Sequence, residues 1–266
     1  MRTRRLRLCF MKAKPLNTTA AFSRIELVVV VALIGLVGKI GFVSCGEAKQ
    51  KAQRLTCANY LRAMHSAYVI WGNDHQDEFP AAAGTTNGGW RDRLSTTNAG
   101  AYCWTNYTIM VNELGQSPKI VICASDKRIA ATNFVGKGSP EDHGNADFDN
   151  IKISYFVGVQ AGIGHPDSIL MGDRNIGPGS VPDPDYGFSP ADGNGNDAVI
   201  NGPVCWSLRI HSNGKPVGAG NVLLCSGSVQ QVTSRELQSN CLKVELDDAK
   251  TWAKTKSAVE IRLIFP

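Results

Sequence analysis

The sequence predicts an α+β fold, in which a long N-terminal helix, membrane-spanning in its first half, packs on an antiparallel β-sheet. Residues 27–45 form an apolar run that continues without a break into an amphipathic helical pattern ending near Asp74. Beyond Pro80 the chain changes to short β-prone runs separated by Gly, Asn, Pro and Ser clusters. A helix followed by strands is the α+β order, and 266 residues with 43% hydrophobic side chains suffice for one core.

The first 21 residues read as a basic leader. Six of the 28 basic residues precede Phe22 and no acidic residue does, which leaves 22 basic against 23 acidic residues, a net charge of −1. The positive charge therefore belongs to a targeting segment that stays inside, and nucleic-acid binding is excluded as a function class. Met11 offers a second start for a shorter leader.

Residues 22–46 are predicted to be a transmembrane and assembly helix. Twelve Leu, Ile, Val or Phe side chains between residues 27 and 45 outweigh the single Lys39 in transfer free energy. A secretory signal peptide is the competing interpretation. The apolar run is longer than a signal-peptide core, lacks a small-x-small cleavage site and continues into the charged helical residues 47–54.

A carboxylate, Glu26, stands at the start of the apolar run and requires a cationic partner. Cleavage before Phe22 creates one, because the new α-amine is largely protonated at neutral pH. Residues 20–30, AAFSRIELVVV, resemble the cleavage and methylation motif of type IV pilins and type II secretion pseudopilins. The resemblance implies a pilin-like fold, cleavage after Ala21 by a prepilin peptidase, methylation of Phe22 and an assembly role for Glu26. Ala21 stands where that family has Gly.

The resemblance extends along most of the chain, to pseudopilin-like proteins common in planctomycete and verrucomicrobial genomes. It is carried by residues 57–61, 68–80, 123–126, 153–158, 172–175 and 220–231. The last motif of that family has an Asp before a Gly, downstream of a His. Here His211 is present, but Ser226 precedes Gly227, so a role that needs that carboxylate is lost.

Residues 47–266 are predicted to form the globular domain, beginning with the helix of residues 47–74. Its apolar stripe, which we interpret as a core face, consists of Cys57, Leu61, Met64, Tyr68 and Trp71. Predicted strands cover residues 120–123, 151–160, 168–171, 204–210, 222–224 and 228–232, and short helices cover residues 107–114 and 234–246. Residues 177–201 are predicted to be a surface loop.

Six cysteines lie in the globular domain, none with CxxC spacing, so a zinc ribbon is not indicated. A disulfide between Cys57 and Cys123 would join the helix to the sheet. The alternative is buried free thiols that pack as small hydrophobic side chains.

The loop around residues 183–197 offers oxygen ligands at alternating positions and suggests a calcium site at Asp192, Asn194, Asn196 and Asp197. Position six of such a loop is Asp197 instead of Gly, and position twelve is Pro203 instead of Glu. The alternative is a solvated, turn-rich loop. No other cofactor is expected.

Known catalytic motifs are absent from the sequence, and we expect no enzyme activity. The five histidines form no HxxxH or HExxH pattern, and residues 225–227 lack the glycines of a nucleophile elbow and read as a hairpin turn. Asp173 and Arg174 are predicted to form an ion pair or a turn cap. An unrecognised secreted hydrolase is the least favoured alternative.

The function that these observations predict is that of a structural subunit of a type IV pilus or type II secretion pseudopilus. The expected partners are a prepilin peptidase, other pilin or pseudopilin subunits and the membrane. The expected location is the inner membrane, single-pass with an extracytoplasmic C-terminal domain, and the cell surface or periplasm after assembly. The alternative is a membrane-tethered binding module that displays residues 84–100 and 177–201 and does not polymerise.

Overall fold

The computed structural model describes residues 23–95, 99–137, 143–212, 217–242 and 261–266. Contacts between Cα atoms divide the chain into two compact units, Met1–Glu47 and Ala48–Pro266.

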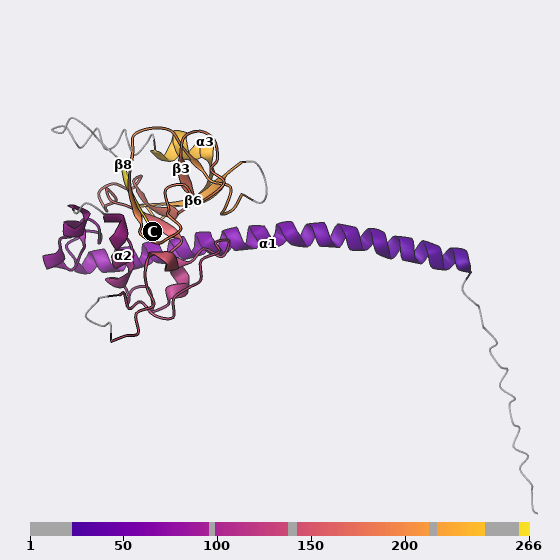
Figure 1. Cartoon of the computed structure of the whole chain (residues 1–266), viewed down its shortest axis with the longest axis horizontal. Coiled ribbons are helices and arrows are strands. Elements are labelled where there is room, and N and C mark those ends of the chain that lie inside the picture. Colours follow the sequence, from indigo (N-terminus) through magenta and orange to yellow (C-terminus); the bar gives the residue numbers. More distant parts are fainter. Residues whose placement is uncertain (1–22, 96–98, 138–142, 213–216, 243–260) are drawn as a thin grey trace, which may run out of the picture. The chain divides into compact units, whose positions relative to one another are not determined.

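One helix, α1, covers Arg24–Asp74, which is 51 residues, and carries Glu26 in its first turn (Figure 1). It ends where the sequence predicts, because the carbonyl of Gly72 accepts hydrogen bonds from the backbone amides of His75 and Asp77. Gln76 and Asp77 then adopt φ angles of 62° and 60°, which turn the chain out of the helix.

The predicted membrane-spanning first half of this helix has to be corrected. Within the part of the chain that the structure describes, no helix combines the length and the apolarity needed to cross a bilayer. The single-pass inner-membrane location derived from this helix is corrected with it.

A six-stranded antiparallel sheet dominates the second unit, in the order β4-β8-β1-β2-β6-β7. Its strands are β1 (Tyr155–Gly158), β2 (Ile169–Asp173), β4 (Asn196–Ile200), β6 (Ala219–Leu224), β7 (Val229–Thr233) and β8 (Ile261–Phe265). A small second sheet pairs β3 (Ile176–Pro178) with β5 (Val204–Trp206). The C-terminal strand β8 lies inside the large sheet, between β4 and β1.

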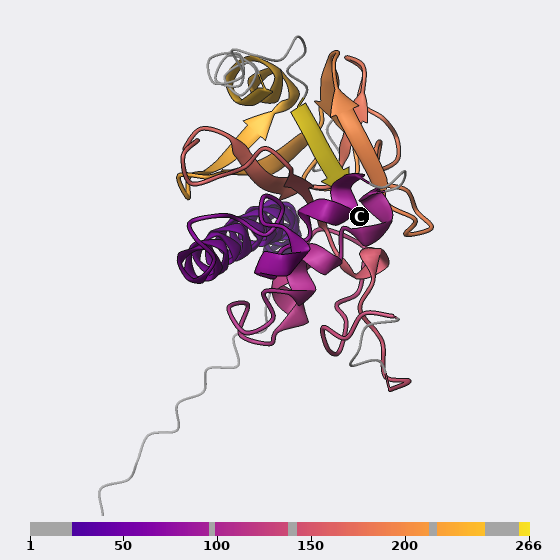
Figure 2. The same cartoon turned by 90° about the vertical axis from the view of Figure 1, so that its left-hand side faces the viewer.

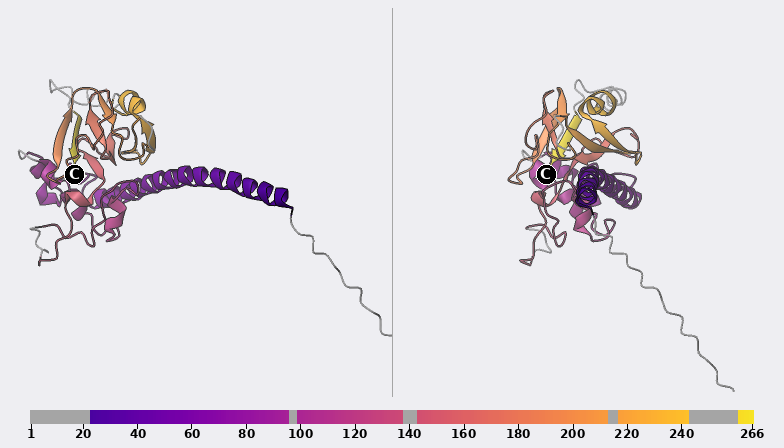
Figure 3. Two further views of the ribbon diagram at one scale, coloured as in Figure 1. Left: turned by 45° about the vertical axis from the view of Figure 1, so that its right-hand side comes forward. Right: turned by 90° about the vertical axis from the view of Figure 1, so that its right-hand side faces the viewer.

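The large sheet separates two apolar cores. Side chains of β1 alternate between them, with Tyr155 and Val157 in the core that contains the α1 stripe and Phe156 in the other. The second core is closed by the β3–β5 sheet and by η6 (Leu237–Leu242), which directly follows the short helix α3 (Ser234–Glu236). In Figures 1 and 3, α3 lies on the side of the sheet away from residues 48–74 of α1.

Short helical segments joined by irregular chain lie next to residues 48–74 of α1, on the same side of the large sheet (Figure 2). They are η1 (Thr85–Asn87), η2 (Arg91–Ser95), η3 (Ala99–Tyr102), α2 (Thr105–Thr108), η4 (Pro118–Val121) and η5 (Asn150–Lys152). Trp90 and Tyr107 are fully buried there, and the Trp90 indole donates a hydrogen bond to Asn106. These short segments therefore contribute core side chains although they form little regular structure.

The apolar stripe of residues 57, 61, 64, 68 and 71 is buried, so its interpretation as a core face is confirmed. Strands are found at the predicted ranges 168–171, 222–224 and 228–232, and Gly227 makes the predicted hairpin turn at a φ of 82°.

Other predicted elements are wrong or shorter. Residues 118–121 form a 3₁₀ turn that begins at Pro118, where a strand was predicted for 120–123. The strands predicted at 151–160 and 204–210 shrink to β1 and β5, and only α2 forms within or beside the helix predicted at 107–114. The predicted loop 177–201 contains β4.

Candidate functional site

Three distant segments bring two thiols and an imidazole together inside the second unit. Cys57 comes from α1, Cys123 follows η4, and His211 lies in the loop after β5. The Sγ atoms of both cysteines and a ring nitrogen of His211 lie within 4.8 Å of one another. The Cys123 Sγ is 3.3 Å from the His211 Nε2. All three residues are buried, so solvent does not separate these groups.

Local structure holds Cys57 and His211 in place. Cys57 belongs to the buried stripe of α1, and its Sγ accepts a hydrogen bond of 3.1 Å from the backbone amide of Ala124. The Gln53 side chain, one turn earlier on α1, donates to the Ala124 carbonyl at 3.0 Å. His211 has a φ of 57°, in the left-handed region that costs a non-glycine residue roughly 1–2 kcal/mol. The surrounding fold thus holds His211 in an unfavourable backbone conformation.

A buried carboxylate, Asp173 at the end of β2, completes the cluster. Its Oδ2 accepts a hydrogen bond from the Asn221 backbone amide at 2.6 Å and lies 3.4 Å from the His211 Nε2. The Asn221 Nδ2 lies 3.2 Å from the same ring nitrogen. Asp173 Oδ1 and Asn221 Oδ1 are buried and have no hydrogen-bond partner among the described residues.

These contacts shift the ionisation of the whole group. The neighbouring Cys123 thiol lowers the pKa of Cys57 to about 5, and burial raises the pKa of Cys123 well above its ordinary value. Burial raises the pKa of Asp173 to about 7. Burial opposes the charged form of His211, but the Asp173 carboxylate and the Cys57 sulfur together outweigh burial and raise the pKa of the imidazole. The cluster therefore combines three acidic groups with one imidazole in a low-dielectric interior.

A buried ion pair lies beside this cluster. The Arg174 Nε and Nη2 donate to the Asp126 Oδ2 and Oδ1 at 2.7 and 3.0 Å, and both side chains are almost completely buried. The guanidinium also lies 3.6 Å from the centre of the Tyr186 ring. Arg174 therefore does form a buried ion pair, but with Asp126 and not with its neighbour Asp173.

The other predicted site residues are dispersed. Ala21 and Phe22 lie outside the described residues, and Glu26 is exposed in the first turn of α1. Cys57 and Cys123 are free thiols in the structure, so the disulfide stays a prediction.

The predicted calcium loop is divided between a turn and a strand. Asp192 accepts hydrogen bonds from the backbone amide and side chain of Asn194, whereas Asn196 and Asp197 belong to β4. The Asp197 carboxylate accepts hydrogen bonds from Arg262 at 2.8 and 3.0 Å. Calcium binding at this loop stays a prediction, with one of its four residues already bound to an arginine.

Sequence reasoning missed the joining of His211 to the two cysteines. It named Cys57 and Cys123 as a pair and noted His211 separately, but the intervals of 66 and 88 residues follow no metal-site pattern. The packing of α1 against the turn after η4 and the loop after β5 brings them together.

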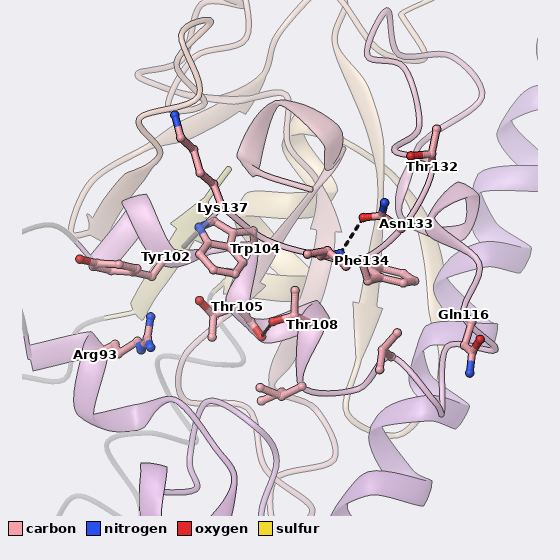
Figure 4. A pocket seen from close by; sticks show the side chains of 13 residues that line it. Arg93, Tyr102, Trp104, Thr105, Thr108, Gln116, Thr132, Asn133, Phe134 and Lys137 are labelled. Carbon is pink, nitrogen blue, oxygen red and sulfur yellow. Dashed lines mark hydrogen bonds between the residues drawn. The ribbon is translucent and has the colours of Figure 1, made fainter. Parts of the chain in front are cut away.

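A cavity of about 840 Å³ lies elsewhere in the second unit. Figure 4 shows Arg93, Tyr102, Trp104 and Lys137 toward one end, and Gln116, Thr132 and Asn133 toward the other. The Arg93 guanidinium lies 5.2 Å from the centre of the Tyr102 ring. The cavity thus offers aromatic surface next to two cationic side chains.

Comparisons with known proteins found no match for this chain, neither among family models, nor among curated proteins, nor among solved structures.

Proposed function

We propose that this protein is a pilin-like structural subunit that assembles with other subunits through the first half of α1. The observation that supports this is the exposure of that helix segment. From residue 23 to residue 36 every described side chain is exposed, including the large apolar side chains of Ile25, Leu33, Ile34 and Leu36. Each such side chain gains about 1.5–3 kcal/mol when it is fully buried.

The proposed occupant of this apolar surface is the same helix in neighbouring subunits. The apolar positions surround the helix instead of forming one stripe, which is the pattern of a helix covered on all sides. A bundle of such helices covers it in this way. The domain half of α1 needs no such cover, because its apolar stripe is buried within its own unit.

Glu26 fits this arrangement as the group that sets the register between helices. It is the acidic residue of the first turn and is exposed in the isolated chain. Cleavage between Ala21 and Phe22 by a prepilin peptidase would place a protonated amine four residues before it. In an apolar bundle, an unpaired carboxylate is costly, so pairing Glu26 with the amine of a neighbouring subunit favours one axial offset.

The test is to express the full chain together with a prepilin peptidase and to shear and sediment the product. We expect a chain that begins at methylated Phe22, identified by intact mass and N-terminal sequencing, and that pellets as filaments. Leu33→Asp should abolish pelleting. Leu55→Asp is the matched control, because the two leucines on α1 are 57% and 56% exposed. Equal pelleting of both variants, or an uncut chain, contradicts the proposal.

A second candidate function, a binding module that does not polymerise, is favoured by the cavity beside Trp104. Its aromatic and cationic lining suits an anionic sugar, whose ring stacks on the indole while its carboxylate meets Lys137 or Arg93. Titration of a polyuronate oligosaccharide into wild type and Trp104→Ala, followed by calorimetry, tests it. Binding by wild type alone, together with failure to pellet, favours this candidate.

A further inference from the structure

We propose that Cys57, Cys123 and His211 bind a zinc ion, with the Asp173 carboxylate as the fourth ligand. Two thiolates and one imidazole are ligands that zinc prefers, and a carboxylate oxygen is compatible with them. The residues come from α1, from the turn after η4 and from the loop after β5. The ion would thus join the helix to the sheet region at a single point.

The distances suit a tetrahedral ion. Zinc bonds of about 2.3 Å to sulfur and about 2.0 Å to nitrogen or oxygen place neighbouring ligand atoms roughly 3.3–3.8 Å apart. The Cys123 Sγ to His211 Nε2 distance is 3.3 Å, and the three ligand atoms all lie within 4.8 Å. The Asp173 Oδ2 to His211 Nε2 distance is 3.4 Å. Small side-chain shifts therefore bring the ligands around one centre.

The hydrogen bonding of the cluster is incomplete without an ion. The His211 Nε2 has either one hydrogen or one lone pair, yet it faces the Cys123 thiol, the Asp173 carboxylate and the Asn221 amide. The Asp173 Oδ1 is fully buried and accepts no hydrogen bond from the described residues. Burying an ionised carboxylate with an unpaired oxygen costs free energy, and a cation bound to the same carboxylate lowers this cost.

The charges also balance with a divalent cation. Two thiolates and the Asp173 carboxylate carry three negative charges, and zinc neutralises two of them. The Arg54 side chain, whose Nη2 donates to the Gly220 carbonyl at 3.2 Å, has a favourable electrostatic interaction with Asp173 and offsets the third. The amide of Ala124 donates to the Cys57 sulfur, which stabilises a thiolate there.

The site is enclosed, which indicates a structural and not a catalytic ion. All four residues are buried, with exposures of 5% or less, and none of them lines the cavity beside Trp104. A catalytic zinc keeps an open position for water or substrate, whereas a closed site contributes to folding. We therefore expect the ion to be taken up during folding and released only when the domain opens.

The experiment measures metal content in the full-length chain purified with a reductant and without a chelator. Inductively coupled plasma mass spectrometry should find one zinc per chain in wild type. Cys57→Ser and His211→Ala should reduce this at least about tenfold, since losing even a hydrogen-bond partner of a ligand lowers metal affinity by roughly 10–100-fold. Cys205→Ser is the matched control, since Cys205 is a buried free thiol in β5, outside the cluster, and it should keep the ion.

Two further measurements keep the test decisive if a variant fails to fold. Wild type refolded with cobalt should show sulfur-to-cobalt charge-transfer bands and the intense visible bands of a tetrahedral site. His211→Cys, which replaces one ligand by another, should retain zinc. Wild type that holds no zinc with its thiols reduced overturns the proposal. So does wild type that contains a Cys57–Cys123 disulfide, seen as a cross-linked peptide, or that takes up copper(I) instead of zinc.

Discussion

The two halves of α1 differ in what covers their apolar side chains. In residues 24–36 the apolar side chains are exposed around the whole helix, and only Arg24 and Glu26 are charged. In residues 48–74 one stripe is buried, and the opposite face is mostly polar, with Leu55 and Ile70 as its exposed large apolar side chains. One half is therefore complete within its own domain, whereas the other remains to be covered. A continuous helix can thus serve folding at one end and assembly at the other.

The domain half of α1 also carries buried or partly buried polar groups that interact with other segments of the domain. Cys57 and His65 on α1 contact groups from the loops, with the His65 Nε2 2.8 Å from the Cys225 carbonyl oxygen. Mutations in this half should change the free energy of unfolding, and mutations in the first half should change assembly alone.

The largest loss of stability is expected from Arg174→Met, which leaves the buried Asp126 without its cation. Removing one partner of a buried pair costs about 3–5 kcal/mol. Arg209→Met is the control, because its partner Asp185 is 75% exposed and exposed pairs contribute about 0–1 kcal/mol. Urea denaturation of both variants measures the difference, and equal midpoints would show that the buried pair contributes nothing.

Leu61→Ala should cost about 2–5 kcal/mol, because Leu61 is fully buried and the cavity cannot close completely. Leu55→Ala and Leu33→Ala, on exposed positions of the same helix, should stay within about 0.5 kcal/mol of wild type. The free energy of unfolding decides between them. A large loss in Leu33→Ala would mean that the first half is already covered within the chain.

Acid should destabilise the domain through Asp126. Burial alone would raise the pKa of this carboxyl, but the Arg174 guanidinium and the Ser154 hydroxyl outweigh burial and hold it below its ordinary value. Its contribution to stability is therefore present above the unfolded pKa of about 3.9 and is lost as pH falls through the lower folded value. Comparing denaturation at pH 5 and in that acidic range, wild type should lose more stability than Asp126→Asn. Parallel losses would exclude this carboxyl as the cause.

Glu26→Gln should have the smallest effect on folding, within about 0.5 kcal/mol of wild type, because the side chain is exposed. It should nevertheless reduce sedimentable filaments, since the neutral amide cannot pair with an ammonium group. Asp167→Asn, another exposed carboxylate, serves as the control for charge alone. If filaments form equally in both, the register role of Glu26 is wrong.

Local patterns allowed much of this architecture to be predicted. The spacing of Cys57, Leu61, Met64, Tyr68 and Trp71 placed them on one buried face, because a helical period is a property of neighbouring residues. The hairpin around Gly227 followed from a tight-turn signal between two β-prone runs. The strand predicted at residues 120–123 was wrong. Val and Ile in this segment favour a strand, but Pro118 starts a 3₁₀ turn over residues 118–121.

By itself, the sequence determined the α+β class, the extent of the long helix and its core stripe. The tertiary structure decided which distant groups meet: the position of β8 between β4 and β1, the pairing of Asp126 with Arg174, and the meeting of Cys57, Cys123 and His211. The physical reason is that secondary structure depends on near neighbours along the chain. A buried polar cluster instead depends on how a helix docks on a sheet, and no spacing in the sequence encodes that contact.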